Sequence, residues 1–136
     1  ISLPAGMSYS SGAFDGTVLE TIKLVKCAKH ASISANTSNA ATNFTSSNAK
    51  YTPWYVASQQ RKVNLIVGTG INKITNFAFN GSNASNLTIF VEDASIATVG
   101  SNNVPYTNAT KYFGLGTAWE YNTTTGLPQV KEATEA

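Results

Sequence analysis

The sequence predicts an all-β fold, a β-sandwich preceded by an extended N-terminal arm. Short runs of β-branched and aromatic residues, separated by turns rich in Gly, Asn and Ser, predict the sandwich. A regular apolar spacing in the first nine residues predicts the arm. We expect residues 1–12 to form the arm and residues 13–136 to form a single head domain, because no linker divides the rest of the chain.

The arm is predicted by the positions of its large apolar residues. Four of them fall on odd positions, namely Ile1, Leu3, Met7 and Tyr9. In an extended strand this spacing places all four side chains on one face. Pro4 has no backbone N–H to donate, so a strand that contains it belongs at the edge of a sheet.

The segment from residue 17 to residue 35 carries two competing patterns. Thr17 and Glu20 have the spacing of a capping box, which favours a helix. Apolar residues also alternate with polar ones, as expected in strands, at Ile22 and Leu24 and again around Ile33. We favour strands here because the chain beyond residue 50 has a clear β pattern. Residues 36–50 form a polar loop.

The remaining chain contains six short runs with strand character, each bounded by turn residues. The sequence therefore predicts about seven strands, the number typical of an immunoglobulin-like or pilin-like β-sandwich. No internal repeat of 20–50 residues is visible. The predicted runs are Trp54–Ala57, Lys62–Val67, Ile74–Phe79, Leu87–Val91, Ile96–Val99 and Lys111–Tyr121.

Composition excludes several classes of protein. Charged residues make up 12% of the chain, about half the usual quarter. The basic residues show no clustered face with interleaved aromatics, so we expect no nucleic-acid partner. No stretch approaches the ~18 apolar residues of a membrane span. Cys27 is the one cysteine, which leaves no intrachain disulfide to stabilise the fold.

The polar residues form many sites for N-linked glycans. Asn, Ser and Thr together account for 45 of the 136 residues. Random order of these residues gives about three Asn-x-Ser/Thr triplets, whereas the chain has seven. Covalent N-linked glycans would keep a surface with so few charges hydrated. The candidate glycosylation sites are Asn36, Asn43, Asn80, Asn83, Asn86, Asn108 and Asn122.

The sequence reveals no active site, and we predict no catalytic, cofactor-binding or metal-binding residues. Cys27 and His30 have helical spacing, but a structural zinc site needs four ligands and the chain has no other Cys or His. Glu92 and Asp93 are neighbours on a predicted strand and face opposite ways, so they cannot form a catalytic carboxylate pair. The Gly-Thr-Gly stretch at 68–70 is typical of a turn.

Aromatic residues leave a second function open. A monomeric carbohydrate-binding or adhesin module would use an exposed aromatic platform centred on Trp54 or Trp119. Aromatic side chains also fill the core of a sandwich, which is the commoner arrangement.

The arm favours assembly over monomeric binding. A free strand with apolar side chains and unpaired backbone groups is unfavourable unless a partner supplies a sheet edge. Pairing with the sheet of an identical subunit is donor-strand complementation. Because that head-to-tail contact does not close, it generates a helical homopolymer.

These features together resemble the subunit of archaeal threads, the thin glycosylated surface filaments of thermoacidophilic archaea. The resemblance extends over the chain and is carried by the Ile1–Tyr9 arm, the seven sequons and the β pattern. It implies a pilin-like sandwich completed by the N-terminal strand of a neighbour, and an extracellular filament for adhesion, cell–cell contact or biofilm formation. The start at Ile1 fits a mature N-terminus left after removal of a signal peptide.

Overall fold

The computed structural model describes residues 1–4, 14, 16–26, 32–33, 52–94 and 96–131. Strands predominate over helices in this part of the chain, which confirms the β-rich class. Two parallel sheets form the body. The main sheet has five strands in the order β1 (Ser2–Pro4), β2 (Thr21–Val25), β4 (Val63–Val67), β6 (Leu87–Val91) and β8 (Thr110–Phe113).

The second sheet has three strands, and a third sheet is a hairpin. The three-stranded sheet has the order β3 (Ser32–Ile33), β5 (Lys73–Ile74) and β7 (Thr98–Val99). The hairpin pairs β9 (Trp119–Tyr121) with β10 (Pro128–Val130) in antiparallel fashion. The helical segments are α2 (Pro53–Ser58), α3 (Val104–Asn108) and the 3₁₀ turn η1 (Ala84–Asn86).

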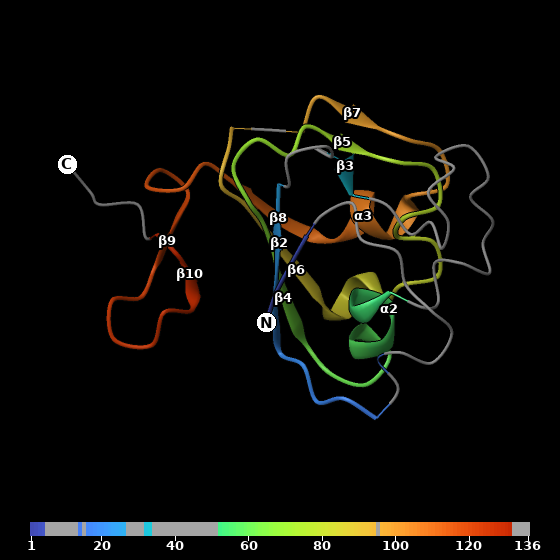
Figure 1. Cartoon of the computed structure of the whole chain (residues 1–136), viewed down its shortest axis with the longest axis horizontal. Coiled ribbons are helices and arrows are strands. Elements are labelled where there is room, and N and C mark those ends of the chain that lie inside the picture. The colour runs from blue at the N-terminus through green and yellow to red at the C-terminus, as the bar shows by residue number, and fades with distance from the viewer. Residues whose placement is uncertain (5–13, 15, 27–31, 34–51, 95, 132–136) are drawn as a thin grey trace.

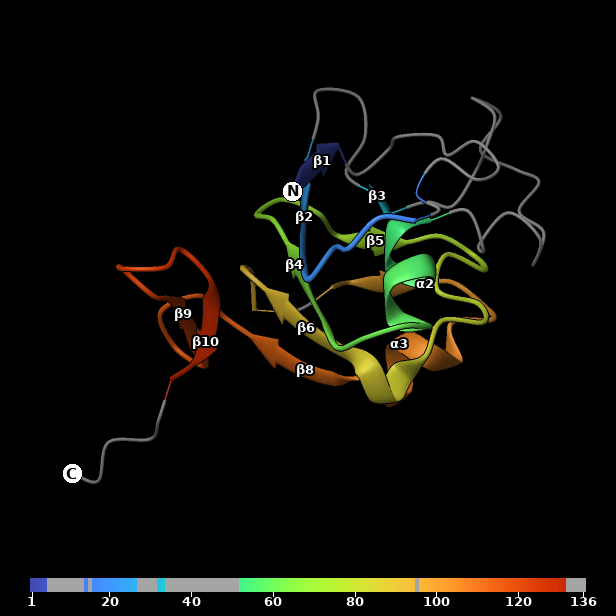
Figure 2. The same cartoon turned by 90° about the horizontal axis from the view of Figure 1, so that it is seen from below.

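The chain coils between the two parallel sheets. β2 is followed by β3, β4 by β5 and β6 by β7. Each such pair is one coil of the chain, and it contributes one strand to the main sheet and one to the second sheet. Figure 2 shows β2, β4, β6 and β8 side by side in the main sheet. Residues at matching positions stack in rows across it, as in Leu65 opposite Ile89. The structure therefore repeats coil by coil, although no repeat is visible in the sequence.

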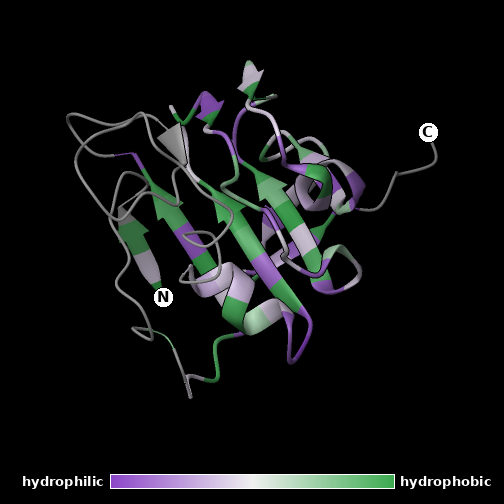
Figure 3. Cartoon of the chain, turned by 90° about the vertical axis from the view of Figure 1, so that its right-hand side faces the viewer, coloured by the Kyte–Doolittle hydropathy of each residue, from purple (hydrophilic) through white to green (hydrophobic). Residues whose placement is uncertain are grey.

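The parallel pairing corrects the expected immunoglobulin-like sandwich, whose sheets are antiparallel. Every pair within the two sheets of the body is parallel. Parallel strands need long crossover connections and are usually covered on both faces. Helices α2 and α3 lie on one side of the main sheet and the β9–β10 hairpin on the other (Figure 1). In Figure 3 the central strands are mostly hydrophobic, with single hydrophilic bands.

The run Trp54–Ala57 was predicted as a strand and is a helix instead. The Thr52 side chain accepts a hydrogen bond from the backbone N–H of Tyr55 at 3.3 Å, and Pro53 follows in the first turn. A threonine cap followed by proline is a strong helix start, and it outweighs the strand preference of the aromatic residues.

Other predicted strands are shorter than expected. In the run at 74–79, only Ile74 belongs to a strand, β5 (Lys73–Ile74), before the chain turns. In the run at 96–99, only Thr98 and Val99 belong to a strand, β7. The run at 111–121 divides into β8 and β9. The predictions at 62–67 and 87–91 are confirmed as β4 and β6.

The core lies mainly between the main sheet and the helices. Its cluster combines inward residues of β2, β4 and β6 with Trp54 of α2 and Phe79, whose ring centroids are 5.4 Å apart. A second, smaller cluster lies on the opposite face of the sheet, where Trp119 packs against Ile66 and Phe90. The main sheet is thus covered by apolar groups on both faces, as parallel sheets usually are.

Candidate functional site: sheet edges and sequon surface

The sequons in the described part of the chain lie in connections and at element ends. Asn80 and Asn83 lie in the turn region after β5, and Asn86 ends η1 immediately before β6. Asn108 is the last residue of α3 and Asn122 follows β9. Asn36 and Asn43 lie outside the described residues.

The side chains of these asparagines differ in their contacts. The Asn86 amide nitrogen donates to the backbone carbonyl of Ser58 at 2.8 Å. The Asn122 amide oxygen accepts from the backbone N–H groups of Thr124 and Thr125. Asn108 is exposed, whereas Asn86 is partly buried. Asn108 therefore offers the more accessible amide.

We expect the occupancy of Asn108 to exceed that of Asn86 when the protein is secreted from an N-glycosylating host. A glycan on Asn86 would have to be accommodated beside its contact with Ser58. Peptide mapping by mass spectrometry measures both occupancies. Asn108→Gln should remove one glycan from the intact mass and Asn86→Gln should remove little. Equal occupancy at the two sites would contradict this ranking.

The N-terminal strand lies at one edge of the main sheet. β1 pairs with β2 of the same chain, with Leu3 opposite Leu24. The Lys23 backbone N–H donates to the carbonyl oxygen of Ile1 at 2.8 Å. Leu3 is partly buried against the core, while Ile1 is 54% exposed. Met7 and Tyr9, also predicted for this face, lie outside the described residues.

The opposite edge of the main sheet is β8. It pairs with β6, and no described strand pairs with its other side. The Lys111 ammonium donates to the backbone carbonyls of Tyr106, Thr107 and Ala109 at 2.9, 2.7 and 3.0 Å. It thereby caps the end of α3, where a cation is favourable. Burial lowers the pKa of Lys111.

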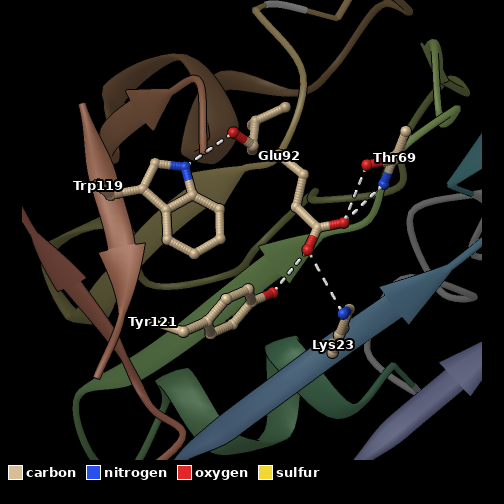
Figure 4. A network of polar contacts seen from close by, with 6 residues as sticks. Lys23, Thr69, Glu92, Trp119 and Tyr121 are labelled. Carbon is tan, nitrogen blue, oxygen red and sulfur yellow. Dashed lines mark hydrogen bonds and ion pairs between the residues drawn. The ribbon is translucent and has the colours of Figure 1, made fainter. Parts of the chain in front are cut away.

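A polar network joins the main sheet to the β9–β10 hairpin (Figure 4). One oxygen of the Glu92 carboxylate accepts from the Tyr121 hydroxyl at 2.7 Å and lies 3.4 Å from the Lys23 ammonium. The other accepts from the backbone N–H of Thr69 at 2.8 Å. Nearby, the Trp119 indole N–H donates to the carbonyl oxygen of Val91 at 2.8 Å.

The network stabilises the charged form of Glu92. Burial by itself raises the pKa of the Glu92 carboxyl. The hydrogen bonds from Tyr121 and Thr69, with the nearby Lys23 ammonium, outweigh burial and hold the pKa below its ordinary value. Burial, and then the Glu92 carboxylate, raise the pKa of Tyr121. The hydrogen bond between them therefore joins an ionised Glu92 carboxylate to a neutral Tyr121 hydroxyl.

The two neighbouring carboxylates bind one turn. Asp93 accepts from the backbone N–H of Gly70 at 2.9 Å, next to the contact of Glu92 with Thr69. Gly70 has φ +89°, a conformation that strongly favours glycine. The turn predicted at 68–70 is therefore held by the two carboxylates that follow β6. The expectation that Glu92 and Asp93 lie on a strand and face opposite ways is wrong, because both follow β6 and accept from the same turn. Nothing local in the sequence shows that this turn and the carboxylates meet.

Neither tryptophan forms an exposed sugar-binding platform. The Trp54 and Trp119 side chains are both fully buried. Their indole N–H groups donate to backbone carbonyls, that of Trp54 to Ala78 at 2.9 Å. Both rings therefore serve packing, and the monomeric carbohydrate-binding alternative has no exposed indole to use.

Cys27 and His30 lie outside the described residues. Within the described ranges, no group of three or more His, Cys, Asp or Glu side chains is arranged to hold a metal ion. No helix in the same ranges has the length and apolar character needed to cross a membrane.

The candidate site is thus a sheet whose two edge strands, β1 and β8, each have one partner among the described strands, with sequons in the surrounding connections. Comparison of this chain with protein-family models, curated proteins and solved structures found no match.

Proposed function

We propose that this chain is the structural subunit of an extracellular, N-glycosylated filament that serves adhesion, cell–cell contact or biofilm formation. Identical subunits join head to tail in a helical homopolymer through the N-terminal strand. The observation that carries the proposal is the position of β1, a short strand at one edge of a parallel sheet, opposite the β8 edge, which no other described strand covers.

The geometry of β1 favours a role as a joint. Among the described residues, β1 is a three-residue strand paired with β2, and Leu3 is its apolar anchor directed at the core. A strand of this kind can add to the sheet of another copy, since backbone groups supply the affinity and one side chain supplies the register. The two edges differ, so the contact is head-to-tail, and it gives an open filament when its rotation does not close a ring.

The sequon distribution supports an extracellular coat. Asn80 and Asn83 lie in the turn region after β5, and Asn108 and Asn122 lie at element ends. Glycans at these positions would hydrate the connections of the chain. The resemblance to archaeal threads implies the same combination of glycans and strand addition.

Removal of residues 1–9 is expected to abolish filaments, because the strand that joins the subunits is lost. Leu3→Asp should do the same in the full-length chain, since it places a charge against the apolar core. Negative-stain electron microscopy detects the filaments, and circular dichroism checks that the monomer keeps its β structure. Leu3→Met is the matched control and should polymerise. Normal filaments from the deletion variant would disprove the proposed function.

A further inference from the structure

We propose that the acceptor for the N-terminal strand is the open edge of β8 in a second copy. Ser2 of one copy lies opposite Tyr112 of the next, and Leu3 lies opposite Phe113. The five-stranded sheet then continues through the filament. This inference deepens the proposed function and depends on it, because it names the surface and register of the joint between subunits.

The first argument concerns the backbone groups of β8. The Gly114 N–H donates to the carbonyl oxygen of Val91, on the β6 side. Backbone groups of alternate residues point to opposite sides of a parallel strand. Lys111 and Phe113 therefore direct their N–H and C=O groups away from β6. No described residue accepts from or donates to these outward groups.

The second argument concerns the backbone groups of β1. Ile1 directs its carbonyl oxygen toward β2, where it accepts from the Lys23 N–H. By the same alternation, Ser2 directs both its N–H and its C=O outward. Opposite Tyr112, Ser2 donates to the Lys111 carbonyl and accepts from the Phe113 N–H. This register satisfies both outward groups of Ser2.

Pro4 restricts the register further. Its nitrogen carries no hydrogen, and it occupies the outward position two residues after Ser2. Sliding β1 by two residues would place Pro4 opposite Tyr112 and leave the Lys111 carbonyl without its donor. Opposite Gly114, Pro4 instead leaves the carbonyl of Phe113, the last residue of β8, without a donor. The missing donor lies at the end of β8 when Ser2 is opposite Tyr112, and inside β8 when β1 is shifted by two residues.

The side-chain rows of the sheet continue across this joint. The row on the core face runs through matching positions of β1, β2, β4, β6 and β8, and the next residue in it would be Leu3 of the second copy. Apolar side chains therefore meet apolar side chains at the joint, as they do inside each subunit. The members of this row are Leu3, Leu24, Val67, Val91 and Phe113.

The β8 edge also lacks the usual protection against pairing. Exposed edge strands are commonly guarded by lysine side chains that remain in solvent. The Lys111 ammonium is instead bound by three carbonyls at the end of α3. Its charge is thus held by the helix, and the backbone of β8 is left open to a partner strand.

The experiment uses disulfide trapping in a Cys27→Ser background. Neighbouring strands lie about 4.8 Å apart, which suits a disulfide between facing residues. Ser2→Cys with Tyr112→Cys should give a ladder of covalent oligomers on a non-reducing gel after mild oxidation of filaments. Ser2→Cys with Thr107→Cys is the matched control. It should give no ladder, because the exposed residue 107 lies on α3, outside the register of the joint.

A third pair tests where β1 resides. Ser2→Cys with Lys23→Cys should give an intramolecular disulfide, since these positions face each other within one chain. A ladder from this pair would show that β1 leaves its own sheet for β2 of a neighbour, and would overturn β8 as the acceptor.

The unmodified protein provides an independent measurement. A sheet of five strands per subunit predicts a helical rise of about 24 Å along the filament. Filaments with a clearly different rise, or with no ladder from the Ser2–Tyr112 pair, would overturn this joint and leave the proposed function intact. Absence of filaments from the wild-type chain would overturn both.

Discussion

Trp54→Ala is expected to lower the free energy of unfolding by about 3–5 kcal/mol, a large part of the stability of a small domain. The Trp54 side chain is fully buried, and its ring lies 5.4 Å from that of Phe79 between centroids. Its indole N–H donates to the Ala78 carbonyl at 2.9 Å. Truncation removes a large apolar surface and leaves that buried carbonyl without its donor.

Urea denaturation followed by circular dichroism measures this loss. Trp54→Phe is the control, since it keeps an aromatic ring and removes the indole N–H. We expect it to cost less than alanine, on the order of 1–3 kcal/mol for the unpaired carbonyl. A Trp54→Ala variant within 1 kcal/mol of the wild type would show that the ring does not support the core, and would contradict the packing of α2 described here.

Trp119→Ala is expected to release the β9–β10 hairpin while the main sheet stays folded. The Trp119 ring lies 5.2 Å from Phe90 and 5.0 Å from Tyr121, between centroids. These residues belong to the smaller cluster, on the face of the sheet opposite α2. A loss of about 3 kcal/mol from this cluster corresponds to roughly 100-fold faster amide exchange in the hairpin.

Hydrogen exchange read by mass spectrometry separates local from global opening. Peptides covering β9 and β10 should lose protection in Trp119→Ala, and those covering β4 and β6 should keep it. Tyr121→Phe is the matched control, because it removes only the hydroxyl that donates to Glu92 at 2.7 Å. It should loosen the hairpin less. Equal loss of protection in the hairpin and in β4 would show one cooperative unit instead.

The two tryptophans illustrate what sequence reasoning resolved and what it missed. Aromatic residues in a β-rich chain predict core packing, and both Trp54 and Trp119 are buried. The helix around Trp54 was missed although Thr52 and Pro53 form a recognisable start signal. The strand preference of Trp, Tyr and Val conflicts with that signal. A run of six residues is too short for periodicity to distinguish the two.

The β8 edge could not have been found from the sequence. The run at 111–121 contains Gly114 and Gly116, which indicate a turn or bulge, but nothing in it indicates that the strand before them forms the edge of a sheet. Nothing in the sequence indicates that Lys111 binds the end of α3. That contact spans only two to five residues, but it forms because α3 ends next to β8, and the sequence pattern predicts no helix there.

The sequence by itself determined the β-rich class, the two central strands and the positions of the sequons. Alternation and turn residues are local properties, and they fix which residues are extended and where the chain turns. Only the tertiary structure decided that the strands pair in parallel and that β1 and β8 form opposite edges. Alternation specifies the face that a side chain occupies but not the strand beside it. Pairing is chosen by burial over the whole coil, where Leu65 meets Ile89 and Val67 meets Val91.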